Sequence, residues 1–216
     1  MNAGAITPTE RTRVKRRRER ASYECEVIRS ILDTALICNV AFVADSGHPV
    51  VLPTIHGRID DTLYVHGSVV SHMLRTIGAG AECCVNATVV DGLVLARSAF
   101  HHTMNYRSVV VYGTPRVVTD DDEKVEGMRA MSERITPGRW DDVRAPSSKE
   151  LAQTMVLALP LDEASAKVRT GPPADDDDDL ATATCWAGVL PLHLARGAPV
   201  ADDPTGDAPL PAYLTP

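Results

Sequence analysis

The amino-acid sequence predicts a mainly β protein with short helices, built as a small closed barrel with helical attachments. About six or seven segments have the apolar runs or the alternation typical of strands, and turn signals separate them. Two segments have helical patterns instead: Glu24–Asp33 carries apolar residues at helical spacing, and Asp120–Ile135 begins with acidic residues. A chain of 216 residues is long enough to bury one sizeable core.

The first predicted strands form an antiparallel meander. Ala35–Ala44 is an almost continuous apolar run, which predicts a strand buried on both faces. The turn Asp45-Ser46-Gly47 leads into the strand Pro49–Gly57, and a second turn leads into Leu63–His66. Pro53 lacks a backbone donor, so it indicates an edge strand or a bulge.

The second half of the predicted sheet contains a hairpin and three later strands. Cys83–Val90 is the first arm of the hairpin, Asp91-Gly92 is its turn, and Leu93–Ala96 is the returning arm. The later strands are Tyr106–Val118, Thr154–Leu161 and Thr184–Leu194, and the last of them carries Trp186.

Two shorter segments complete the predicted elements. Ser147 and Glu150 have the spacing of a capping box, which predicts a short helix. The acidic run Asp175–Asp179 is predicted to be a solvated loop.

We divide the chain into a basic arm at 1–22, a split-barrel domain at 23–196 and a tail at 197–216 rich in proline and aspartate. Seven basic residues lie between Arg11 and Arg20, which is typical of a nucleic-acid arm or of a surface-wrapped segment. The formal net charge of −7 favours the second interpretation and argues against a general nucleic-acid binder.

The sequence predicts neither a membrane-spanning protein nor a protein that binds a metal ion through its own side chains. The sequence has no apolar run near the roughly 18 residues that span a bilayer. Five cysteines without a C-x-x-C pair are typical of free thiols in a reducing cytoplasm. His101-His102 lacks a carboxylate at ligand spacing, so we predict no metal site there.

The stretch His66–Ile77 has the strongest pattern for ligand binding. Apolar residues recur at i, i+3, i+4 and i+7, which predicts a helix, and the opposite side is polar. This polar stripe consists of Ser68, Ser71, His72 and Arg75. Gly67 allows the turn from strand to helix, and free N–H groups at a helix start bind anions. The alternative is a surface helix that Ser68 caps and that has a wet polar face.

Arg107 is in register with two valines of the strand Tyr106–Val118, so it is predicted to be half-buried. A half-buried guanidinium needs an anionic or carbonyl partner. A ligand phosphate or carbonyl satisfies this need, and an internal aspartate satisfies it equally well.

Several motifs together resemble a known family. They are Val51-Leu-Pro-Thr54, Leu63-Tyr-Val-His-Gly-Ser68, Asn105-Tyr-Arg-Ser-Val109, Ser165-Ala-Lys-Val-Arg169 and Trp186-Ala-Gly-Val-Leu-Pro191. In order and spacing this set resembles the pyridoxamine-5′-phosphate-oxidase-like flavoproteins, and most of all the branch with the nitroimidazole-resistance (Nim-type) proteins. The resemblance implies an FMN-binding split β-barrel and a homodimer with two flavin sites at the subunit interface. Some relatives hold haem or deazaflavin instead.

The resemblance also implies positions for the site residues. It puts Leu52, Pro53 and Thr54 beside the isoalloxazine edge. It puts His66, Gly67, Ser68, Ser71 and His72 around the ribityl phosphate. Asn105, Arg107 and Ser108 line the flavin pocket, and Trp186 comes from the partner subunit or the rim. Where the family usually has a basic residue this chain has His72, and Arg75 lies one turn later.

Two classes of function follow. The first is an FMN-dependent oxidoreductase that reduces a small electron-poor substrate such as a nitroaromatic, with His66 either a general acid or merely hydrogen-bonded. The second is a protein that stores, carries or senses flavin or haem without turnover. FMN is expected rather than FAD, because the chain has no glycine-rich pyrophosphate loop. We expect a cytoplasmic homodimer.

Overall fold

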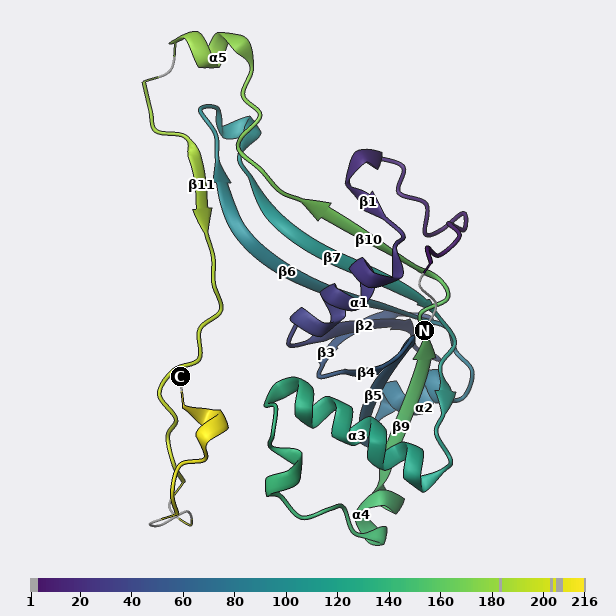
Figure 1. Ribbon diagram of the computed structural model, residues 1–216. Coiled ribbons are helices and arrows are strands. Elements are labelled where there is room, and N and C mark those ends of the chain that lie inside the picture. Colours follow the sequence, from purple (N-terminus) through teal and green to yellow (C-terminus); the bar gives the residue numbers. More distant parts are fainter. Residues whose placement is uncertain (1–3, 183, 203, 205–207, 216) are drawn as a thin grey trace.

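The computed structural model describes residues 4–182, 184–202, 204 and 208–215. Within these residues the strands form two antiparallel sheets with short helices packed on them (Figure 1). The strands are β1 (Ala21–Ser22), β2 (Cys38–Val43), β3 (Pro49–Thr54), β4 (Gly57–Ile59), β5 (Thr62–Ser68), β6 (Cys83–Leu95), β7 (Thr103–Gly113), β8 (Arg116–Val117), β9 (Thr154–Pro160), β10 (Ala164–Arg169) and β11 (Gly188–Pro191). The α-helices are α1 (Cys25–Thr34), α2 (His72–Gly78), α3 (Asp121–Ile135), α4 (Ser148–Gln153) and α5 (Asp177–Thr182). The 3₁₀ turns are η1 (Arg18–Arg20), η2 (Ala99–His101), η3 (Trp140–Asp142) and η5 (Ala212–Leu214).

The fold is mainly β with short helices, as predicted, and the barrel is split, as the family resemblance implies, rather than closed, as the strand pattern alone predicts. The larger sheet has the order β1-β10-β7-β6-β2-β3, and β11 pairs with the last residues of β6, from Gly92 to Leu95. The smaller sheet has the order β4-β5-β9-β8. The chain passes between the sheets at His56, so the predicted strand Pro49–Gly57 is two strands, and only its first part pairs with β2.

The main core lies between the two sheets. Its members include Ile28 and Leu32 of α1, Val40 of β2, Leu63 of β5 and Val109 of β7, all almost fully buried. Burial of this apolar surface is the main source of stability for such a fold.

Helix α3 covers the outer face of the smaller sheet, where a second apolar cluster contains Tyr64, Met131 and Val156. Gly57 of β4 makes this close approach possible. A Cβ atom there would lie 2.7 Å from the backbone nitrogen of Met131. The helix begins after Asp120, whose side chain accepts a hydrogen bond from the backbone of Glu123, as its acidic first turn predicts.

Other local predictions are confirmed. Helix α1 occupies the predicted segment, and the Ser147–Glu150 capping box is present at the start of α4. Gly47 has φ of +80° in the turn between β2 and β3. Pro53 lies in β3, an edge strand.

The prediction of a hairpin turn at Asp91-Gly92 is wrong. Strand β6 continues to Leu95, with a register shift between Val90 and Gly92 where it pairs with β7. Gly92 has β11 beside it, since a Cβ there would lie 3.0 Å from the carbonyl oxygen of Leu190. Neighbouring strands on both sides therefore keep the chain extended through a dipeptide that favours a turn when local preference alone decides.

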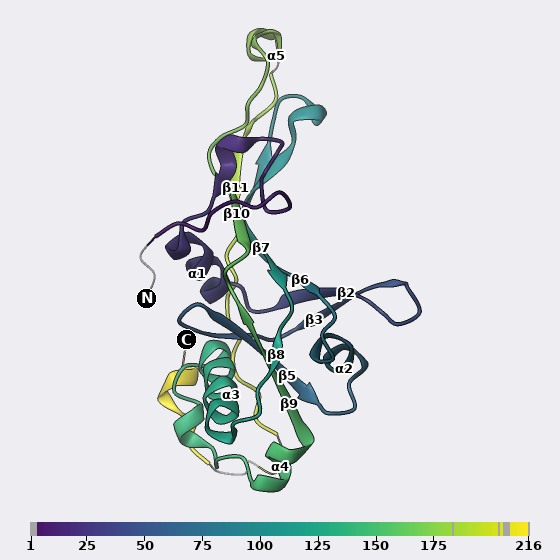
Figure 2. The same ribbon diagram turned by 90° about the vertical axis from the view of Figure 1, so that its right-hand side faces the viewer.

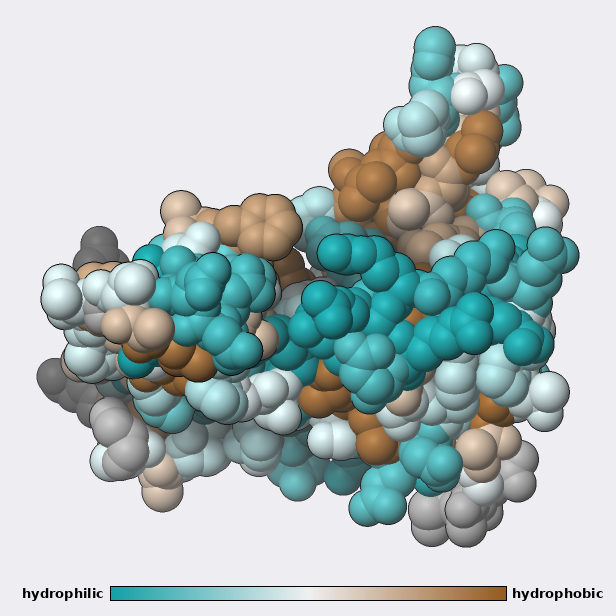
Figure 3. All heavy atoms as spheres, turned by 90° about the horizontal axis from the view of Figure 1, so that it is seen from above, coloured by the Kyte–Doolittle hydropathy of each residue, from teal (hydrophilic) through white to brown (hydrophobic). Residues whose placement is uncertain are grey.

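The predicted burial of β2 on both faces is also wrong. Cys38, Val40 and Phe42 are buried, whereas Val43 is 59% exposed. The outer face of the neighbouring β3 is likewise apolar and open, with Val51 60% exposed. Figure 3 shows hydrophobic surface over this β2–β3 projection, which points away from the body in Figure 2.

The acidic run is only partly a solvated loop. The carboxylate of Asp175 is almost fully buried and bonds to the backbone and guanidinium of Arg97. The following residues begin α5, at the far end of the arm that β6 and β7 form in Figure 1. The last predicted strand is shorter than expected, because β11 begins at Gly188 and Trp186 precedes it.

The described part of the basic arm wraps on the surface. Strand β1 pairs with β10, and Arg11 forms ion pairs with Glu82 and Glu163. Figure 3 shows strongly hydrophilic surface over this segment, in the middle of the face seen from above. Among the described helices, none has the length and apolar character needed to cross a bilayer.

Candidate functional site

Two clefts contain three of the predicted site residues, which are His72, Arg75 and Arg107. The first, here called the α2 cleft, has a volume of about 520 Å³, and His72, Arg75 and Thr76 line it together with Asp45. The second, here called the C-terminal cleft, has a volume of about 770 Å³ and lies between β6, β7, the end of α1 and the segment Leu192–Leu194. Both volumes lie within the range that binds small ligands in proteins.

The α2 cleft contains His72 and Arg75 of the predicted polar stripe, but the helix is shorter than the sequence predicts. It begins at His72, and the Ser71 hydroxyl accepts a hydrogen bond of 3.5 Å from the backbone of Leu74. Ser68 ends β5 instead of capping the helix, and Val70 is 75% exposed because it precedes the first turn. The structure therefore brings His72 and Arg75 together and corrects the predicted helix start.

His66 does not point into the α2 cleft. Its ring packs toward α3, with Nδ1 3.2 Å from the sulfur of Met131. Burial lowers the pKa of His66, so the imidazole is neutral at neutral pH. The adjacent Gly67 faces the other way, since a Cβ there would lie 3.0 Å from the side chain of Leu74.

Apolar side chains make up most of the C-terminal cleft. Its lining includes Leu36, Ile37, Val89, Val90, Leu192 and Leu194. His193 is an exposed residue on the same wall, and Arg107, Asp91, Thr34 and Thr88 supply the other polar groups. Imidazole beside apolar walls is a donor set that suits the iron of a large planar ring system such as haem.

An internal aspartate is the partner of Arg107, as one of the sequence alternatives predicts. The guanidinium donates to both carboxylate oxygens of Asp91, at 2.9 and 2.8 Å, and this contact raises the pKa of Arg107. A bidentate pair of this kind fixes the orientation of both side chains. Arg107 therefore lines the C-terminal cleft while its charge is already compensated.

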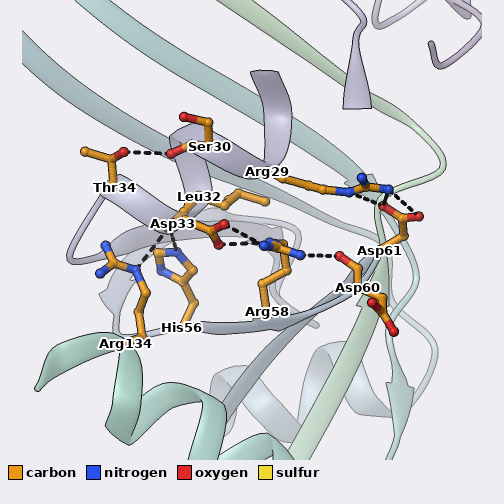
Figure 4. Close-up of polar contacts among 10 residues, drawn as sticks. All are labelled: Arg29, Ser30, Leu32, Asp33, Thr34, His56, Arg58, Asp60, Asp61 and Arg134. Carbon is orange, nitrogen blue, oxygen red and sulfur yellow. Dashed lines mark hydrogen bonds and ion pairs between the residues drawn. The ribbon is translucent and has the colours of Figure 1, made fainter. Parts of the chain in front are cut away.

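A set of polar contacts holds α1, and with it one wall of this cleft (Figure 4). The ring of His56 and the guanidinium of Arg134 both reach the carbonyl oxygen of Leu32 near the helix end. Arg134 also donates to the carbonyl of Ala35, at 2.8 Å. These contacts satisfy backbone groups that a helix end leaves free, and they fix the chain that continues to Ile37.

The remaining predicted residues lie outside both clefts. Leu52, Pro53 and Thr54 are on the edge strand β3. Asn105 is buried and donates to the carbonyl of Gly171, and the Ser108 hydroxyl donates to the carbonyl of Lys167. Trp186 is 68% exposed beside β11, whereas α2 lies on the other side of the body in Figure 1. The single chain therefore does not gather all predicted site residues in one place.

His193 is the residue that sequence reasoning missed. It interrupts the apolar run Leu190–Leu194, and that pattern was the available signal. Beyond His193, the guanidinium of Arg196 donates a hydrogen bond to the carbonyl of Ile135, so this part of the tail contacts the end of α3.

Two antiparallel sheets in a split arrangement, with short helices and two open clefts, define a split-barrel-like protein. The family model described as pyridoxamine 5'-phosphate oxidase matches residues 24–168. The chain belongs to this family, which confirms the broad resemblance found in the sequence.

Solved structures support the same family assignment. Flavocytochrome Anf3 from Azotobacter vinelandii is 36% identical with a TM-score of 0.89, covering 97% of this chain and 97% of that chain. An FAD and heme binding protein from Mycobacterium smegmatis is 42% identical with a TM-score of 0.84, covering 90% of this chain and 95% of that chain. A putative 5-nitroimidazole antibiotic resistance protein from Bacteroides thetaiotaomicron VPI-5482 is 22% identical with a TM-score of 0.58, covering 68% and 86%, so it shows the fold alone. No curated protein matches the chain.

Proposed function

We propose that this protein binds a flavin and haem and works as an oxidoreductase. The observation that carries the proposal is the C-terminal cleft, where His193 stands among apolar side chains. The names of two similar structures, a flavocytochrome and an FAD and heme binding protein, support it. Membership of this chain in the Nim-type branch of the family stays a prediction.

The residues of the C-terminal cleft fit haem. Within the described residues the His193 ring makes no hydrogen bond, so its nitrogens are available to a metal. Leu36, Ile37 and Leu194 would contact the apolar ring, and exclusion of water by such walls is what haem requires of its surroundings. When bound, haem would supply one-electron chemistry, and the chain would supply the ligand and the apolar walls.

The residues of the α2 cleft fit the phosphate of a flavin. Arg75 and His72 line the cleft, and the Ser71 hydroxyl retains its proton for donation because it acts as an acceptor in the cap. A guanidinium with nearby hydroxyl donors is a strong phosphate partner. The sequence predicts FMN, whereas the relative from Mycobacterium smegmatis is named for FAD. Chromatography of the released flavin distinguishes these two forms.

An alternative is a carrier or sensor that holds flavin or haem without turnover. The predicted substrate of the enzyme is a small electron-poor molecule such as a nitroaromatic. Bleaching of the flavin spectrum by a nicotinamide cofactor, followed by reoxidation on addition of a nitroaromatic, supports the enzyme. A flavin that no reductant bleaches at a useful rate supports the carrier.

We also infer a homodimer. The exposed apolar faces of β2 and β3 support it, because a contiguous apolar patch on a soluble protein marks an interaction surface. The predicted flavin residues that one chain leaves apart, such as Trp186 and Thr54, are also consistent with a site that two subunits complete. Sedimentation at micromolar concentration tests this, and a species of 23.2 kDa would contradict it.

The decisive experiment is haem titration of the purified protein, followed by absorption and electron paramagnetic resonance spectroscopy. We expect a Soret band with the signature of histidine ligation, and we expect His193→Ala to lose that signature. His48→Ala is the matched control, because His48 is exposed in the turn between β2 and β3. Unchanged spectra in His193→Ala would refute the assignment of the cleft.

A further inference from the structure

Within the part of the chain that the structure describes, a buried arginine outside both clefts has no anionic partner. Arg169, at the end of β10, is only 7% exposed. Its guanidinium donates to the side-chain oxygen of Asn105 and to the carbonyls of Gly171 and Pro172, at 3.3 and 3.1 Å for the two carbonyls. Its Nε atom is buried and has no hydrogen-bond partner among the described residues. Buried charges in proteins are normally paired, because an isolated one costs much more than a neutral polar group.

A second arginine, Arg20, immediately precedes β1, the strand that pairs with β10 and places Ala21 opposite Lys167. Repulsion from Arg20 contributes, after burial, to the lowered pKa of Arg169. Arg20 is half-buried at the end of η1, and within the described residues no carboxylate forms an ion pair with Arg20 or Arg169. Arg11, in contrast, is bonded to Glu82 and Glu163. The chain therefore compensates one end of its basic arm and leaves the other end uncompensated.

The surroundings add donors and space. Lys167 is two residues before Arg169 on the same strand, so both side chains leave the same face of the sheet. Its ammonium donates to the carbonyl of Arg16, which holds the basic arm against β10. At Gly171, where φ is +102°, a Cβ atom would meet no heavy atom within 4 Å, so the backbone beside Arg169 is open.

From these contacts we propose that Arg169 and Arg20 form a binding site for a phosphate-bearing anion. Two neighbouring guanidinium groups match the charge of a phosphate, which is close to doubly negative near neutral pH, better than that of a single carboxylate. The Arg169 guanidinium supplies one positive charge that no carboxylate compensates within the described residues, and Arg20 supplies a second from η1, directly before the strand that pairs with β10. The proposal does not depend on flavin or haem binding, since inorganic phosphate has the same chemistry.

The test measures binding of inorganic phosphate to the full chain by calorimetry, at constant ionic strength set with chloride. We expect Arg20→Gln to weaken phosphate binding roughly tenfold or more, the loss of one charge-assisted contact. Arg75→Gln is the matched control, because it removes an arginine from the α2 cleft and leaves this site intact. Arg169→Lys gives a second measurement that keeps a buried charge, and we expect it to weaken binding as well, because lysine lacks the planar fork.

The outcomes are distinct. Equal phosphate affinity in the wild type and Arg20→Gln, or no phosphate binding at all, would overturn the proposal. Loss of binding only in Arg75→Gln would overturn it too, because the phosphate would then occupy the α2 cleft. Repetition with flavin-saturated protein separates the sources of the anion: if saturation abolishes phosphate binding, the flavin supplies the phosphate, and if binding persists, the anion is a separate ligand.

Discussion

Replacement of Arg134 by methionine should destabilise the protein and loosen one wall of the C-terminal cleft. The guanidinium donates to two carbonyls near the end of α1, at 2.8 Å to Ala35 and 3.4 Å to Leu32. The ring of His56 lies 2.9 Å from the same Leu32 oxygen and remains in the variant, so that contact is partly redundant. Methionine keeps the apolar stem, so packing against the stem changes little.

The magnitude follows from the contact that has no substitute. One hydrogen bond from a charged donor is worth about 1.5–3 kcal/mol, and a cation near a helix C-terminus adds about 0.3–1 kcal/mol. Burial opposes this gain, because it lowers the pKa of Arg134, while Asp33 attracts the charge. We therefore expect the free energy of unfolding to fall by about 2 kcal/mol.

Urea unfolding, followed by circular dichroism at equal protein concentration, measures this change. Arg134→Lys is the control, because it keeps the charge and one donor but not the planar fork, and it should lose about half as much. A haem titration of the same variants reports on the cleft, since the chain after Ala35 lines it. A loss below about 0.5 kcal/mol in Arg134→Met would refute the reasoning, because surface substitutions alone produce changes of that size.

Three further predictions concern packing, pH and ligand binding. Gly57→Ala should cost at least about 2 kcal/mol in thermal or urea unfolding, because its Cβ would lie 2.7 Å from backbone of α3, whereas Gly197→Ala meets no atom within 4 Å and should be nearly neutral. Contacts with Arg11 and Thr9 hold the pKa of Glu163 at about 2. The wild type should therefore exceed Glu163→Gln in free energy of unfolding by its full margin above about pH 5, and this margin should vanish as the pH falls toward 2. A margin that stays constant from pH 7 to pH 2 would contradict this. Arg75→Ala should weaken FMN binding to apoprotein roughly ten- to a hundredfold, and His72→Arg should tighten it; unchanged dissociation constants in both would place the phosphate elsewhere.

Local chemistry was enough to predict several elements correctly. The Ser147–Glu150 capping box, the acidic start of α3 and the Gly47 turn each depend on contacts within a few residues. The broad family was also predictable, because its motifs keep their order along the chain. Such features do not require knowledge of which distant strands pair.

The errors arose where distant strands decide the structure. Asp91-Gly92 favours a turn by itself, but β7 and β11 pair on the two sides of β6 and Arg107 bonds the Asp91 carboxylate. Alternation was hidden in β2, because small and apolar side chains occupy both its buried and its open face. An apolar residue on an open face looks the same in sequence as one in the core.

The C-terminal cleft shows why the main candidate site was not predictable as a unit. Its walls come from Thr34–Ile37, from Val89–Asp91 and from Leu192–Leu194, segments that are far apart in the chain. Strand β11 attaches the last of them to β6, and the amide of Leu192 donates to the carbonyl of Asp91 at 3.1 Å. Beyond this anchor Leu194 is 82% exposed, an unfavourable state for an apolar side chain in water. A ligand or a second copy that covers this wall would bury the Leu194 side chain. Binding at His193 would then also remove apolar surface from water, so the two contributions would favour the same complex.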